Sequence, residues 1–147
     1  PPDVRETLEE CERRGDYESA EYEKASAVFY SRHVCRLDPL LEEVEAAFRN
    51  LKEDPTSYLT IQGPSEFVIV GSLKNWEGWQ DAHKIEVETL LLNGGHDEVT
   101  DRAMEPWFKH IPKEKVKWVK FEDASHMAHW EEREKFMSIC GGFLLDN

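Results

Sequence analysis

The sequence is poor in positive charge. Its 147 residues include 18 lysines and arginines against 31 aspartates and glutamates, which gives a formal net charge of −13 at pH 7. A chain of this sign is repelled by nucleic-acid phosphates and by anionic lipid headgroups. We therefore expect no nucleic acid and no membrane among its partners.

Long apolar runs and patterned cysteines are also missing. No stretch approaches the roughly 20 apolar residues that span a bilayer, and no basic segment precedes an apolar one as in a signal peptide. The three cysteines, Cys11, Cys35 and Cys140, are odd in number and widely spaced. This usage fits a reducing compartment better than a disulfide framework, and it favours the cytoplasm.

The first half of the chain has helical and acidic sequence. Asp3 and Glu6 have the spacing of a capping box, and Gly15 suits the end of a first helix. Apolar residues at helical spacing predict a second helix over about 19–36, and Asp38-Pro39 predicts the start of a third. Because the chain opens on Pro1-Pro2 and runs directly into helical sequence, we expect it to be part of a longer protein.

The second half alternates strand and helix signals. Residues 89–93 and 116–121 are short apolar strands, Asp101 can cap a helix between them, and 131–145 form a closing helix. This order predicts an α/β fold with parallel strands and crossover helices. Two parallel strands need further neighbours to form a stable sheet. We therefore expect the chain to contain only the last part of an α/β sheet.

Two polar residues follow the two predicted strands. Asp97 comes after the first strand, in GGHDEVT, and His126 comes after the second, in FEDASHM. Ligands of open α/β sheets bind beyond the carboxyl ends of the strands. An acid followed by a histidine is also the order of the last two members of a Ser/Asp/His triad in α/β-hydrolases. Taken alone, an aspartate in a glycine turn is in most proteins a turn former, and a histidine near a strand end is usually structural.

Several motifs resemble one enzyme family. The chain contains FYSRHVCRLDP at 29–39, GPSEF at 63–67, GSLKNW at 71–76, GGHDEVT at 94–100 and ASHMAHWEE at 124–132. In order and spacing these are similar to the C-terminal half of proline iminopeptidases and related α/β-hydrolase-fold aminopeptidases and amino-acid amidases. The resemblance implies a helical cap segment over residues 1–75 and the C-terminal part of an α/β-hydrolase core over 76–147.

The resemblance also implies roles for four residues. Asp97 matches the acid of the triad and His126 its general base, while Glu66 and Glu98 match the glutamates that bind the free amino terminus of the substrate. From the residues alone, Glu98 could be an acid that favours a helix N-terminus and Glu66 an exposed loop acid. No cofactor and no metal are expected. The substrate implied is a small peptide or an amino-acid amide.

The nucleophile of this family is absent from the sequence. Neither a G-x-S-x-G elbow nor an HGG-type oxyanion loop occurs in the 147 residues. We therefore expect an incomplete enzyme, whose partner is an N-terminal half that carries the serine and the oxyanion hole.

Other interpretations remain open. His126 and His129, with His96 and Asp97, could bind a metal. The same fold with a different specificity could be an esterase, or an epoxide hydrolase or dehalogenase with an aspartate nucleophile. An acidic helical interaction module would account for residues 1–60, but it leaves the aspartate and histidine at the strand ends unexplained.

Overall fold

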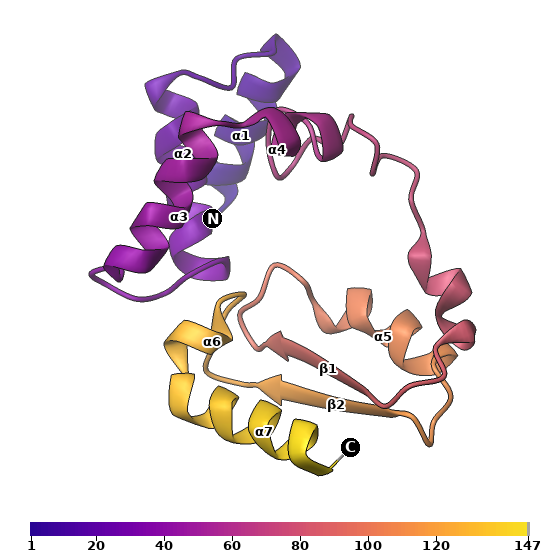
Figure 1. The fold of residues 1–147 in the computed structure, drawn as a ribbon. Helices are drawn as coiled ribbons and strands as arrows, with labels where there is room; N and C mark the ends of the chain where they lie inside the picture. Colours follow the sequence, from indigo (N-terminus) through magenta and orange to yellow (C-terminus); the bar gives the residue numbers. More distant parts are fainter. Residues whose placement is uncertain (147) are drawn as a thin grey trace. The chain divides into compact units, whose positions relative to one another are not determined.

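A computed structural model describes residues 1–146, which form two compact units. The first comprises Pro1–Tyr30 and Leu37–Trp76, and the second comprises Ser31–Arg36 and the residues from 77 onward (Figure 1). The short segment Ser31–Arg36 thus belongs to the second unit, although the first unit precedes and follows it in sequence.

The first unit is helical. It contains α1 (Pro2–Arg14), most of α2 (Ala20–His33), α3 (Glu42–Glu53) and α4 (Thr56–Ile61). Gly15 ends α1 in the left-handed conformation, with φ of 68°, as predicted for a glycine at this position. Its core consists of apolar residues of α1 and α2, namely Leu8, Cys11, Tyr22 and Ala25, with Val4, Tyr17 and Phe67 packed against them.

Three predicted helix boundaries in this part of the chain are wrong. The residue that precedes α1 is Pro1, and no side chain caps this helix, so the predicted capping box is not formed. The third helix begins at Glu42 instead of at Asp38-Pro39. The second helix ends at His33 instead of near Arg36 because the residues after it bind loops of the second unit.

The second unit contains a two-stranded parallel sheet. Its elements are η1 (Gly78–Lys84), β1 (Thr89–Gly94), α5 (Asp101–His110), β2 (Val116–Phe121), α6 (Ala128–Glu131) and α7 (Arg133–Asp146). The register pairs Thr89 with Val116 and Gly94 with Phe121, so the two strands end side by side. The predicted strands and their parallel arrangement are confirmed.

Helices α5 and α7 cover opposite faces of this sheet (Figure 1). Alternate residues of a strand point to opposite faces. One face therefore packs Leu91 and Val116 with Trp107 of α5, and the other packs Leu92 and Phe121 with α7. The residues that follow the strands are consequently held at one edge of a core that is packed on both sides.

Two boundaries in the second unit also differ from prediction. Thr100, and not Asp101, precedes α5, because the Asp101 carboxylate accepts hydrogen bonds from Asn93 and Lys120 instead. The closing helix is divided into α6 and α7, and Glu132 between them has a non-helical φ of −123°. Within residues 1–146, no helix is both long and apolar enough to cross a membrane.

Candidate active site

The loops after β1 and β2 approach each other at two glycines. A Cβ atom on Gly94 would lie 2.4 Å from the carbonyl oxygens of Ala124 and Ser125, and one on Gly95 would lie 2.2 Å from that of Glu122. Any larger residue would therefore force the two loops apart. Backbone hydrogen bonds join the loops, since Gly95 N–H donates to the Phe121 carbonyl oxygen at 2.7 Å. The Gly-Gly pair thus permits this close approach.

This approach brings Asp97 and His126 into contact. Nδ1 of His126 donates to Oδ1 of Asp97 at 3.0 Å. The same carboxylate accepts the backbone N–H of Val99 on Oδ1 at 2.8 Å and that of Gly94 on Oδ2 at 3.1 Å. The Asp97 side chain is 4% exposed and the His126 side chain 46% exposed. A buried, fixed carboxylate therefore orients a half-exposed imidazole.

The environment of Asp97 keeps its carboxylate ionised. Burial acts to raise the pKa of Asp97, but the hydrogen bonds from His126, Gly94 and Val99 outweigh burial and hold this pKa below its usual range. An ionised carboxylate only accepts hydrogen bonds, so Nδ1 of His126 carries the proton in this pair. In the neutral imidazole, Nε2 is then the nitrogen that can accept a proton.

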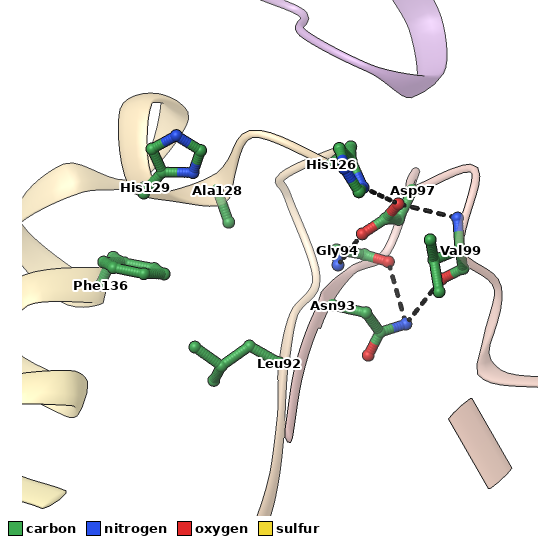
Figure 2. A pocket seen from close by; sticks show the side chains of 9 residues that line it. All are labelled: Leu92, Asn93, Gly94, Asp97, Val99, His126, Ala128, His129 and Phe136. Carbon is green, nitrogen blue, oxygen red and sulfur yellow. Dashed lines mark hydrogen bonds and ion pairs between the residues drawn. The ribbon is translucent and has the colours of Figure 1, made fainter. Parts of the chain in front are cut away.

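Asp97 and His126 line a pocket of about 220 Å³. Figure 2 shows His126 directed at Asp97, with Gly94 and Val99 donating to the same carboxylate. His129 lies on the other side of the pocket, where burial, followed by the nearby charge of His126, lowers its pKa. The lining consists of Leu92, Asn93, Gly94, Asp97, Val99, His126, Ala128, His129 and Phe136.

Asn93, a polar residue that was not predicted to belong to the site, fixes the loop that follows Asp97. Asn93 is buried at the end of β1, and its Nδ2 donates to the Val99 carbonyl oxygen at 3.3 Å and to Asp101 Oδ1 at 2.9 Å. Its Oδ1 accepts the indole N–H of Trp118 at 2.8 Å. Asn93 therefore ties both ends of the Val99–Asp101 segment to the sheet. An asparagine within an apolar strand was the signal available in the sequence.

The two predicted substrate-binding glutamates lie in different units. Glu98 directly follows Asp97, is half-buried, and its backbone N–H donates to the His33 carbonyl oxygen at 3.3 Å. Glu66 is half-buried in the first unit, beside Tyr58. Burial, followed by the charge and hydrogen bond of Glu66, raises the pKa of Tyr58. Neither glutamate is therefore a fully solvated surface acid.

The residues considered as a metal site do not form one among residues 1–146. No group of three or more histidine, cysteine, aspartate or glutamate side chains in this range is arranged to hold a metal ion. His96 is exposed, and its carbonyl oxygen accepts a hydrogen bond from Nδ1 of His33 at 2.9 Å. The side chain of Asp97 is already engaged by the three N–H donors described above.

Comparison with known proteins gives relatives over almost the whole chain. The proline iminopeptidase of Saccharolobus solfataricus is 35% identical over 98% of the chain, and that of Heyndrickxia coagulans is 34% identical over 98%. These alignments cover 46% and 49% of the two proteins, so the chain spans about half the length of the curated relatives that it matches. No protein-family model matches the chain.

Two solved structures share the fold. The crystal structure of VinJ superposes with a TM-score of 0.93 at 37% identity, covering 99% of this chain and 49% of VinJ. The proline iminopeptidase of Mycobacterium smegmatis gives a TM-score of 0.87 at 33% identity, covering 99% of this chain and 48% of that protein. Both neighbours are α/β-hydrolases, and they confirm the predicted fold class. The chain is therefore a relative of the proline iminopeptidases and has the fold of the C-terminal part of an α/β-hydrolase.

Proposed function

We propose that this chain supplies the acid and the general base of a Ser/Asp/His triad. The reaction is the release of an N-terminal amino acid, of the proline type, from peptides or amino-acid amides. The observation that carries the proposal is the 3.0 Å hydrogen bond between buried Asp97 and half-exposed His126 at the ends of adjacent parallel strands. This is the arrangement through which a carboxylate fixes the tautomer of a catalytic imidazole.

The chemistry follows from this tautomer. Nε2 of His126 accepts the proton of the nucleophile as that group attacks the scissile carbonyl, and later returns the proton to the leaving amine. Asp97 remains ionised throughout and stabilises the imidazolium, since its pKa is held low by three N–H donors. General base catalysis of this kind contributes a rate factor on the order of 10² to 10⁴.

The nucleophile and the oxyanion hole belong, in this proposal, to an N-terminal half of the same enzyme. The chain's serines lack the flanking glycines of a nucleophile elbow. Half of the relatives' length is not represented in the chain. Residues 76–147 then form the C-terminal part of the core, and residues 1–75 form the cap segment.

Specificity rests on Glu66 and Glu98. In this proposal their carboxylates bind the α-ammonium group of the substrate by charge-assisted hydrogen bonds. A peptide with an acylated amino terminus leaves these acids without a partner, and such a site rejects it strongly. Because Glu98 directly follows Asp97, a bound ammonium group would be held close to the reacting carbonyl. The enzyme is therefore an exopeptidase or an amidase of free amino-acid amides.

The experiment compares two substrates in the complete enzyme that contains this chain. One is a prolyl or alanyl amide with a free amine, and the other is the same amide with an acylated amine. Losing one charged hydrogen bond costs about 1.5–3 kcal/mol, so Glu66→Gln and Glu98→Gln should each lower kcat/KM for the free amine by about 10- to 150-fold.

An uncharged ester serves as the control, because it depends on the triad and not on the two glutamates. Its turnover should change little in either variant. A wild-type enzyme that hydrolyses the acylated amide as well as the free one would contradict the assignment of Glu66 and Glu98. It would favour an esterase or another specificity on the same fold. Turnover of an epoxide in place of the amide would indicate an aspartate nucleophile.

A further inference from the structure

The carboxylate of Glu131, at the end of α6, binds the backbone beside His126. Oε2 accepts the backbone N–H of Ser125 at 2.7 Å, and Oε1 accepts the hydroxyl of the same serine. Ser125 directly precedes His126 and is fully buried. Oε1 also accepts the backbone N–H of Arg36 at 2.7 Å, 95 residues away in the sequence. Glu131 thus connects the loop of His126 to a distant segment.

That segment, His33–Arg36, contacts both loops of the candidate active site. The His33 carbonyl oxygen accepts the backbone N–H of His126 at 3.2 Å and that of Glu98 at 3.3 Å. The Val34 carbonyl oxygen accepts the N–H of Met127 at 3.0 Å, and the Arg36 guanidinium donates to the Asp123 carbonyl oxygen at 2.8 Å. His33–Arg36 therefore bridges the loop that holds Asp97 and Glu98 and the loop that holds His126.

Three donors meet at the Glu131 carboxylate, and only a carboxylate satisfies them all. A glutamine has one acceptor oxygen and one NH₂ group. If its NH₂ replaces Oε2, it faces the Ser125 N–H, and if it replaces Oε1, it faces the Arg36 N–H. Either orientation places a donor against a donor. The second acceptor oxygen of the carboxylate, and not merely the length of the side chain, is therefore needed to close this contact.

We propose that Glu131 is a positioning residue for the catalytic pair. By binding Ser125 and Arg36 together, it holds the His126 loop against the His33–Arg36 segment and so sets the approach of the imidazole to Asp97. This inference rests on the proposed function, because it assigns Glu131 a role in the turnover carried by His126. Glu131 itself touches no reacting atom and acts through the backbone.

The chain offers a matched control in the neighbouring residue. Glu132 carries the same side chain, but its carboxylate pairs with Lys135 on α7 at 3.0 Å. Glu131→Gln and Glu132→Gln therefore remove the same charge one position apart. Because a displacement of about 1 Å in a catalytic group can cost on the order of 10²-fold in rate, Glu131→Gln should lower kcat about 10- to 100-fold, with KM little changed. Glu132→Gln should leave both constants near the wild-type values.

A spectroscopic measurement separates positioning from general destabilisation. The Nδ1 proton of an imidazole bound to a carboxylate gives a low-field proton resonance, which reports the Asp97–His126 hydrogen bond directly. In the complete enzyme this resonance should be present in the wild type and in Glu132→Gln, and weakened or lost in Glu131→Gln. An unchanged resonance in Glu131→Gln, or a fall in thermal stability with kcat intact, would overturn the proposal.

Two further results keep the inference testable. If Glu131→Gln does not fold, hydrogen exchange of the Arg36 amide in the wild type tests whether the bond to Glu131 is formed. Arg36 is an exposed residue, so slow exchange of its amide reports the bond to Glu131 and not burial, and fast exchange overturns the proposal. If the wild type hydrolyses no amide and the resonance is still lost only in Glu131→Gln, the positioning role stands and the proposed activity fails.

Discussion

Substitution of Gly95 by alanine tests whether the close approach of the two loops creates the site. The added Cβ would lie 2.2 Å from the Glu122 carbonyl oxygen, whereas real Cβ atoms essentially never come within 3.0 Å of such an atom. The backbone must therefore shift by at least 3.0 − 2.2 = 0.8 Å. The neighbour is a backbone atom, so no side-chain rotation can relieve the contact.

The consequences follow from the size of this shift. Overpacking of this kind costs roughly 1–3 kcal/mol of stability. A displacement near 1 Å between Asp97 and His126 should lower kcat on the order of 10²-fold. Thermal unfolding followed by circular dichroism measures the first effect, and amide turnover by the complete enzyme measures the second.

Gly142 in α7 provides the control. A Cβ at this position meets nothing within 4 Å, so Gly142→Ala should stabilise the helix by about 0.5–1 kcal/mol and leave turnover unchanged. If Gly95→Ala melted and turned over as the wild type does, the two loops would not depend on this contact. The Gly-Gly pair would then not be what brings Asp97 and His126 together.

Two further predictions concern Asn93, which lies beside the pair, and Asp97 itself. Asn93→Ala removes the hydrogen-bond partners of the Trp118 indole N–H and of the Val99 carbonyl oxygen. It should therefore lower the free energy of unfolding by about 1–3 kcal/mol. An unchanged denaturant midpoint would contradict a stabilising role for these hydrogen bonds of Asn93. Because folding lowers the pKa of Asp97, its ionised form stabilises the fold above the unfolded pKa of about 3.9, and this contribution is lost as pH falls through the folded pKa. Stability measured from pH 7 down to pH 2 should therefore fall less steeply in Asp97→Asn, and an identical acid slope in both proteins would contradict the assigned shift.

Local sequence signals were sufficient for the two strands, whereas the assignment of Asp97 and His126 as a pair needed the family resemblance as well. The apolar runs at 89–93 and 116–121 have the length of strands and are too short for typical helices, and the structure confirms both as strands. Parallel strands end at one edge of a sheet, which places the residues that follow them near each other, and the structure joins Asp97 and His126 there by a hydrogen bond. The roles of these residues, and those of Glu66 and Glu98, stay predictions.

Contacts that join distant segments could not be predicted in this way. The second helix was expected to continue to about Arg36, but it ends at His33, and the Arg36 N–H binds Glu131 instead of a helical carbonyl. Helical periodicity carries no information about a partner 95 residues away. The same contact occupies the end of α6, where the closing helix was expected to begin at Glu131 and run unbroken.

The most direct test of the proposed triad is the turnover of Asp97→Asn in the complete enzyme. Asparagine retains the shape of the residue but cannot hold the imidazole with its proton on Nδ1, so kcat should fall by about 10⁴-fold while substrate binding is retained. His126→Ala, which removes the base itself, should abolish nearly all turnover. An Asp97→Asn enzyme that works at a near-normal rate would show that the hydrogen bond between Asp97 and His126 is structural and that this pair is not the acid and base of a triad.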